Sequence, residues 1–289
     1  MSDLPSEGFL RGLRPDGLYT PPIKQHSLEK ISLHNQYAGL FNRAVKNKWP
    51  QRAYLGLYSG AGRAQVDPTG EVVETTAMSV FRLPDLFTHY LFVDNDLRCI
   101  EALRSRIATL PWSPEVTLIP KSVEDAIPDI KKALPPYSPE KGLLSLCFID
   151  PFSADLDFRV IRELGQTFKM DFLILLMSAV DIRQNFQRYL EDESDTRIAR
   201  LLDDPAWRDE WASKGMRNKD LVFFILGKFD EAMTRLGYQA STPDESRPVR
   251  VHGKGVLLYH LVFYSKHPIA KKLFQAAKVV TDPQTRLKL

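Results

Sequence analysis

Short apolar runs alternate with amphipathic stretches through the first two thirds of the chain. Five apolar runs have the length and composition of strands buried on both faces: "AYLGLY", "YLFVD", "EVTLIP", "LLSLCFIDPF" and "DFLILLMSA". Helical spacing follows in "LRCIEALRSRIATL", "SVEDAIPDIKKAL" and "FRVIRELGQTF". This alternation predicts a parallel sheet with helices on both of its faces.

The two ends of the chain follow other patterns. Residues 1–22 are rich in Pro, Gly and polar residues and predict an extended arm, and helical spacing begins at Ile23. After the fifth run, residues 183–219 are helical and highly charged, which predicts an inserted cap. The segment "LVFFILGKFDEAMTRLGY" predicts another helix, and "RPVRVHGKGVLLYHLVFYSK" predicts a β-hairpin that turns at "GKG". A final helix is expected from Pro268.

A hairpin at the edge of a five-stranded parallel sheet is the arrangement of Rossmann-like methyltransferases. The predicted fold class is therefore α/β, with a class I methyltransferase-like, mostly parallel sheet. It carries a C-terminal antiparallel hairpin and a helical insertion after the fifth strand. We expect one such domain over residues 23–289, preceded by the arm.

Composition sets the limits on class. The chain has 289 residues, of which 44% are hydrophobic, enough for a full core. The net charge of +3 is too small an excess to indicate a nucleic-acid binder. Cys99 and Cys147 lie in apolar runs and predict buried free thiols, and no Cys and His spacing indicates zinc. With neither a signal peptide nor a membrane-spanning run, a cytoplasmic protein is expected.

The turn after the first apolar run is the first candidate site. If this strand feeds a helix through Ser59, Gly60 and Gly62, backbone N–H groups point toward a ligand and the glycines let it approach closely. The motif is only G-x-G, so a tight strand-to-helix turn without a ligand is an equal alternative.

Two further strand ends carry acidic residues. Asp94 ends the second run, where its carboxylate can accept hydrogen bonds from ribose hydroxyls, while Asp96 caps the next helix. We group Asn95 and Ser122 with the cofactor-binding residues. The interval from Gly62 to Asp94 exceeds that of dinucleotide sites, and "RAQVDPTGEVVETT" is expected to form a loop over the site.

The fourth run ends in "DPF". Asp150 lies at the predicted switch point of the sheet, and the Phe152 ring can stack on a flat substrate. Arg183, after the fifth run, can bind a phosphate or carboxylate, or pair with the acidic cap. Asp150, Phe152 and Arg183 are the candidate catalytic residues. Features at three strand ends favour a ligand site over purely structural roles.

Basic side chains lie near both ends of the chain. Lys24, His26 and Lys30 could reach over the cofactor or grip an acidic substrate, although a solvated helix face accounts for them at least as well. Of these, Lys24 and His26 are the candidate substrate-binding residues. From Ser246 onward, nine Lys and Arg residues face a single acidic residue, Asp282. This skew is consistent with docking of nucleic acid or of an acidic protein, or with a solvated rim.

Together these motifs resemble the three-Cys-motif partner proteins. The resemblance spans most of the chain, and its carriers are "KQHSLEK", "YLGLYSGAG", "FVDND", "CFIDPF", "DFLILL", the Arg of "DIRQN" and "LVFYSKHPIA". It implies a methyltransferase-like fold and a partner protein with three cysteines that is similar to radical S-adenosylmethionine enzymes. It implies these more firmly than it implies a reaction.

The chain differs from that family at two places near the expected cofactor loop. Gly56 stands where the family usually has an acidic residue, and residues 75–78, "TTAM", stand in place of "GSPL". Two functions therefore remain open. The first is an S-adenosylmethionine-binding methyltransferase. The second is a non-catalytic partner protein with a degenerate cofactor site. A nuclease is a weaker third alternative, because the strand-end carboxylates do not form an evident metal cluster.

Overall fold

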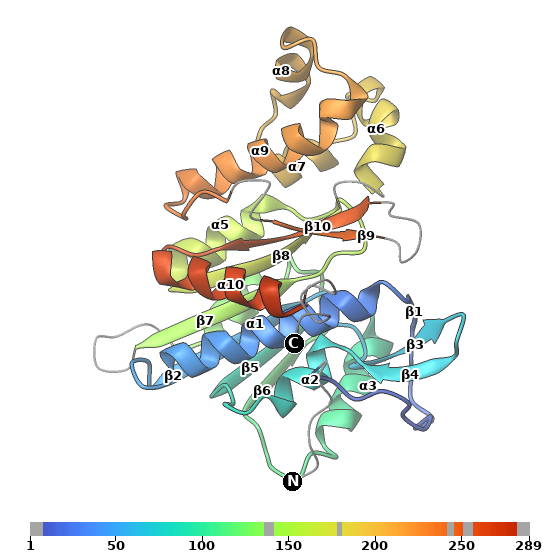
Figure 1. The fold of residues 1–289 in the computed structure, drawn as a ribbon, viewed down its shortest axis with the longest axis vertical. Helices are drawn as coiled ribbons and strands as arrows, with labels where there is room; N and C mark the ends of the chain where they lie inside the picture. Colours follow the sequence, from blue (N-terminus) through green and yellow to red (C-terminus); the bar gives the residue numbers. More distant parts are fainter. Residues whose placement is uncertain (1–7, 136–141, 178–180, 242–245, 251–256, 282–289) are drawn as a thin grey trace.

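A seven-stranded sheet forms the centre of the molecule (Figure 1). The structure is a computed structural model that describes residues 8–135, 142–177, 181–241, 246–250 and 257–281. The strands follow the spatial order β6 (Val116–Ile119), β5 (His89–Val93), β2 (Gln51–Leu57), β7 (Leu143–Ile149), β8 (Met170–Leu176), β10 (Leu257–Tyr264) and β9 (Arg247–Arg250).

Strand directions identify the fold class. The strands from β6 to β8 are mutually parallel, whereas β10 is antiparallel to both β8 and β9. A parallel sheet that ends in this antiparallel pair is the class I methyltransferase-like arrangement. The predicted fold class is therefore confirmed. The tip of the C-terminal hairpin lies outside the described residues.

Helices cover both faces of the sheet because the strand side chains alternate between two cores. On one face, Tyr54 and Phe92 pack with α1 (Ser27–Val45), α3 (Leu97–Ile107) and α10 (Pro268–Thr281). On the other face, Leu55 and Val93 pack with three further helices: α4 (Ile127–Ala133), α5 (Phe158–Thr167) and α9 (Leu221–Arg235). Such two-sided burial accounts for the nearly continuous apolar runs.

The predicted helical cap lies beyond the β10 side of the sheet (Figure 1). It consists of α6 (Asp181–Glu191), α7 (Arg197–Leu202), α8 (Trp207–Ser213) and the short helix η2 (Asn218–Asp220). The buried Trp211 ring lies 4.7 Å from Phe186 and 5.2 Å from Phe224, measured between ring centroids. Aromatic packing therefore joins the cap helices to α9.

A second, three-stranded sheet replaces two of the predicted features. It contains β1 (Pro22–Lys24), β3 (Arg63–Asp67) and β4 (Glu71–Glu74). Ile23 thus lies in a strand, and the first helix begins four residues later. The segment expected to form a loop over the site is instead the β3–β4 hairpin, followed by the short helices α2 (Thr76–Ser79) and η1 (Val80–Arg82).

The N-terminal arm packs against the body of the protein. Phe9 is fully buried, and the nearly buried Arg106 of α3 reaches the arm with several hydrogen bonds. Its guanidinium donates to the Asp16 carboxylate at 2.8 and 2.9 Å, and to the carbonyl oxygens of Tyr19 at 3.0 Å and Ala61 at 2.6 Å. Arg106 thereby fixes the arm next to the turn after β2.

Two expectations from composition can be compared with the described residues. Cys99 and Cys147 are buried and free, as predicted. Within the described ranges, no helix is long and apolar enough to cross a bilayer.

Candidate functional site

Three of the predicted motifs meet at one edge of the central sheet. The parallel strands β2, β5 and β7 all end there, and β2 lies between the other two. The chain leaves β2 toward β5 on one side, and returns to β7 on the other. This is the switch point at which open α/β sheets bind ligands. The ends of these strands supply Ser59, Asp94 and Asp150.

The turn after β2 has an unusual backbone. Tyr58, Gly60 and Gly62 have positive φ values of 61°, 66° and 82°. A side chain at Gly62 is excluded, because its Cβ would lie 2.6 Å from Met78 Cγ. At Gly60 a Cβ would meet no atom within 4 Å. The left-handed backbone of the non-glycine Tyr58 is of the kind that concentrates at functional sites.

The turn does not lead into a helix, so that part of the prediction is wrong. It leads into β3, and no helix N-terminus therefore follows the turn directly. An apolar run followed by glycines is typical of a strand that turns into a helix. The next five residues, Arg63–Asp67, instead alternate between buried and exposed side chains, as a short strand does. The backbone N–H of Ser59 donates to the Val93 carbonyl oxygen at 3.0 Å and that of Gly60 donates to Asp94, so neither of these groups is directed at a ligand.

Asp94 organises the same turn. Its carboxylate accepts hydrogen bonds from the backbone N–H groups of Gly60 at 2.7 Å and Asp96 at 2.9 Å. Burial is the main cause of the raised pKa of Asp94, and these two hydrogen bonds oppose it. Asp96 caps α3 by accepting from the Arg98 N–H at 2.9 Å, as predicted. A second lone pair on each Asp94 oxygen is still able to face a ligand.

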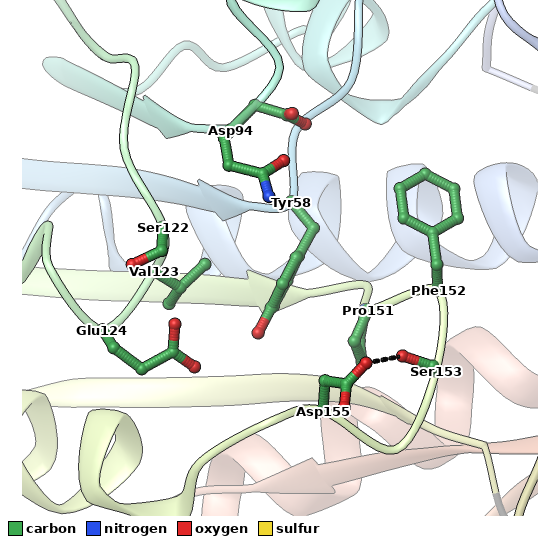
Figure 2. A pocket seen from close by; sticks show the side chains of 10 residues that line it. Tyr58, Asp94, Ser122, Val123, Glu124, Pro151, Phe152, Ser153 and Asp155 are labelled. Atoms are coloured by element: carbon green, nitrogen blue, oxygen red, sulfur yellow. Dashed lines mark hydrogen bonds between the residues drawn. The ribbon is translucent and has the colours of Figure 1, made fainter.

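A pocket of about 260 Å³ lies beside Asp94 (Figure 2). Ten residues line it: Tyr58, Asp94, Asn95, Ser122, Val123, Glu124, Pro151, Phe152, Ser153 and Asp155. Figure 2 shows the Tyr58 side chain in the middle, with Ser122 and Glu124 on one side and Phe152 on the other. Burial, followed by the nearby acidic side chains, raises the Tyr58 pKa. The pocket thus joins four predicted site residues.

A smaller, narrower pocket of about 80 Å³ shares Tyr58 and Phe152 with the first. It is bounded by the arm, by α1 and by the turn after β2, and Asp150 lies at its wall. Ser59 and Thr75 are among its lining residues, and their hydroxyl oxygens are buried without a hydrogen-bond partner. Ten buried side-chain atoms of the described residues lack a partner, and these two hydroxyls are the ones that belong to residues of this pocket.

Three further candidate residues line the larger pocket and differ in how exposed their side chains are. Phe152 is 83% exposed although it is a large aromatic side chain. Ser122 is less available, because its hydroxyl donates to the Asp125 carboxylate at 2.8 Å and accepts from the Asp125 N–H at 3.1 Å. Asn95 is exposed at the pocket mouth.

Four candidate residues lie outside both pockets: Gly62 of the turn, Lys24, His26 and Arg183. Lys24 forms an exposed ion pair with Asp67 at 2.5 Å on the small sheet. His26 stacks edge-on against Tyr259 at 6.0 Å, and burial, followed by the charge of Lys30, lowers its pKa. Arg183 is exposed on α6, and the predicted ion pair with the acidic cap is not among the contacts of the described residues.

Two other residues take part in the site. Lys30 forms an ion pair with Asp150 at 2.5 Å at the smaller pocket, so of the three basic residues expected to reach the cofactor or substrate it is the one that lines a pocket. Asp181 accepts a hydrogen bond from the Ala154 N–H at 2.7 Å and fixes the loop after "DPF". Lys30 lies within the "KQHSLEK" motif, and Asp181 is one of the strand-end carboxylates of the sequence, after the fifth apolar run. Among the described residues, no cluster of three or more metal-ligating side chains occurs.

Known proteins resemble the chain only distantly. No family model matches it. No curated protein matches it. A solved Legionella pneumophila protein of the family model DUF519 shares 12% identity over 88% of this chain and 93% of that chain, with a TM-score of 0.46.

Methyltransferases are also among the similar structures. The magnesium protoporphyrin IX methyltransferase of Synechocystis, with bound SAH, shares 6% identity over 83% of this chain and 87% of that chain, with a TM-score of 0.41. A geranyl diphosphate methyltransferase in complex with SAM shares 11% identity over 84% and 90%, with a TM-score of 0.38. These similarities assign no residue roles, and the fold class rests on the strand order.

Proposed function

We propose that the protein is an S-adenosylmethionine-dependent methyltransferase whose cofactor spans the two pockets. One observation carries this proposal: the pockets meet at the switch point of a methyltransferase-like sheet, directly beside the open Gly60 backbone. The larger pocket has Asp94 for a nucleoside, and the smaller has unpaired polar groups for a polar tail.

Each part of the cofactor has residues that fit it. Asp94 would accept hydrogen bonds from the ribose hydroxyls, with Asn95 and Ser122 at the edge of the nucleoside pocket. The Ser59 and Thr75 hydroxyls would pair with the methionine end. Gly60 leaves room for the sulfur region to approach the backbone, because no atom lies where its Cβ would be.

The chemistry asks the protein mainly for positioning. The cofactor, when bound, supplies an electrophilic methyl group. The exposed Phe152 ring would stack on a flat acceptor at the junction of the pockets, and Asp150 would accept a hydrogen bond from the acceptor or from the methionine ammonium. Arg183 remains a candidate for gripping an acidic acceptor. Holding donor and acceptor in line while excluding water supplies most of the rate enhancement.

Calorimetric titration with S-adenosylhomocysteine and S-adenosylmethionine tests this function. We expect saturable binding well below millimolar ligand, and no comparable binding of ATP, which shares the adenosine but lacks the methionine. Absence of binding at millimolar concentrations of both adenosyl ligands would refute the methyltransferase proposal.

A second candidate function is a non-catalytic partner of a three-cysteine protein. The observation that favours it is the Gly56 position, where the Phe92 ring occupies the space that a side chain would need. Under this alternative the protein binds the three-cysteine protein through its basic C-terminal face but binds no adenosyl ligand. Co-purification with such a partner, combined with a negative titration, would support this function over methyl transfer.

A further inference from the structure

Two charged side chains line the smaller pocket, and they pair with each other. Lys30 extends from the first turn of α1, and Asp150 follows the end of β7, so their 2.5 Å ion pair crosses between two elements. The side chains are 16% and 21% exposed. In the described part of the chain, no third charged residue lines this pocket.

Fold stability alone accounts poorly for this pair. The pair is mostly buried, and the cost of removing two charges from water offsets much of their attraction, so such a pair is weak evidence for a stabilising role. The pair also faces a small cavity whose Ser59 and Thr75 hydroxyls lack partners. One cation, one anion and two hydroxyls around a single cavity are complementary to a small zwitterion.

An acidic residue within β2 would be the alternative partner for an ammonium group, and the packing around Gly56 excludes it. A Cβ on Gly56 would lie 2.9 Å from Phe92 Cδ1 and 3.4 Å from Tyr54 Cε1, so an acidic side chain does not fit there without displacing an aromatic ring. Asp94 lines the larger pocket and not the smaller one. Asp150 is the acidic residue left to meet a positive charge in the smaller pocket.

We propose that this pocket binds the α-amino acid group of the cofactor, with Lys30 binding its carboxylate and Asp150 its ammonium. The assignment rests on the proposed function and gives the charged pair a specific role. When an amino acid group enters, the single Lys30–Asp150 pair is exchanged for two charge-assisted contacts. Lys30 is then a cofactor-binding residue, and Asp150 acts on the cofactor rather than on the methyl acceptor.

The consequence is selectivity for adenosyl compounds that carry a complete amino acid group. Four adenosyl thioethers differ in whether they carry the ammonium and the carboxylate of the amino acid group. S-adenosylhomocysteine has both charges, and 5′-methylthioadenosine has neither. The 3-aminopropyl thioether of 5′-deoxyadenosine lacks only the carboxylate, and the 3-carboxypropyl thioether lacks only the ammonium. Calorimetric titration of the full chain with all four compounds measures each contact without altering the protein.

Two variants assign the contacts to residues. Lys30→Met should weaken binding of S-adenosylhomocysteine tenfold or more, but should not weaken binding of the 3-aminopropyl thioether, because it frees Asp150 from its ion pair. Asp150→Asn should weaken binding of S-adenosylhomocysteine similarly, but should not weaken binding of the 3-carboxypropyl thioether, because it frees Lys30 from its ion pair. Lys24→Met is the matched control, because Lys24 also forms a 2.5 Å ion pair but lies outside the pocket. It should leave all four affinities unchanged.

The melting temperature shows whether each variant is folded. If a single unpaired charge impairs folding, the double variant K30M/D150N, which removes both charges, is used instead. Its affinities for S-adenosylhomocysteine and 5′-methylthioadenosine should be equal within about twofold. Binding of 5′-methylthioadenosine as tight as that of S-adenosylhomocysteine in the wild type would overturn this inference while leaving nucleoside binding intact. Failure of both compounds to bind would overturn the proposed function as well.

Discussion

Replacing Asp94 with Asn tests whether this carboxylate binds the ribose or only shapes the turn. The carboxylate accepts two backbone hydrogen bonds, from Gly60 and Asp96, and it also lines the nucleoside pocket. An Asn side chain has one oxygen acceptor where Asp has two, so one of these N–H groups loses its partner. The variant separates the two roles because it keeps the shape of the side chain.

The expected magnitudes follow from these contacts. Losing one hydrogen bond to a charged group destabilises the fold by about 1.5–3 kcal/mol. Burial raises the Asp94 pKa, which shows that the charge itself is unfavourable there, and a neutral amide relieves part of that penalty. We therefore expect only a small drop in melting temperature. Loss of a hydrogen bond between a ribose hydroxyl and the carboxylate should weaken binding of S-adenosylhomocysteine by about 1.5–3 kcal/mol, roughly 10- to 150-fold.

Titration with adenosine and 2′,3′-dideoxyadenosine identifies the contact. Wild-type protein should prefer adenosine, and Asp94→Asn should lose that preference. Asp96→Asn is the matched control, because Asp96 does not line the pocket and Asn also caps helices well. If Asp94→Asn lowers the affinities for adenosine and its dideoxy analogue equally, the residue shapes the turn and does not bind the ribose.

Other predictions concern stability, the acceptor and the partner. Burial raises the pKa of Asp171 to about 7, so the folded protein keeps a proton that the unfolded chain releases near pH 4. Stability should therefore fall by about 1.4 kcal/mol per pH unit between those values, and Asp171→Asn should abolish that fall in pH-dependent urea melts; an unchanged slope would contradict the raised pKa. Phe152→Ala should leave the melting temperature unchanged, since the ring is 83% exposed, but lower turnover of an aromatic acceptor about tenfold or more; equal turnover would exclude stacking. Reversing Lys271 and Lys272 to Glu should slow association with a three-cysteine partner more than it speeds dissociation, as measured by surface plasmon resonance at low and moderate salt. An unchanged association rate would show that this basic face is merely solvated.

The central sheet was predictable because its strands are buried on both faces. All seven residues of β8 are buried, and such runs stand out from the amphipathic helices between them. The ends of parallel strands lie at one edge, so the approach of Asp94 and Asp150 to a common site followed from the sequence without knowledge of side-chain packing. Direct contacts, such as that of Gly60 with Asp94, did not follow from it.

The small sheet and the role of Lys30 were not predictable in the same way. Strand β1 is three residues long and pairs with β3, which lies about forty residues further along, so no local pattern marks it. The pairing moves the start of α1 from Ile23 to Ser27, and this shift places Lys24 on the small sheet and Lys30 in the pocket. Tertiary contacts thus decided which basic residue of one motif reaches the site.

The same reasoning bears on the choice between an enzyme and a non-catalytic partner. Gly56 and Phe92 are a complementary pair on adjacent strands, because the Phe92 ring fills the volume above the glycine. Gly56 is therefore part of a packed core, and the absence of an acidic side chain from β2 leaves no empty space there. The absence of this acid argues against cofactor binding only if no other carboxylate reaches the pocket. Asp150 does reach the pocket, where it forms an ion pair with Lys30. The charges that a methionine group needs are present, but they come from β7 and α1 instead of from the first strand of the parallel sheet.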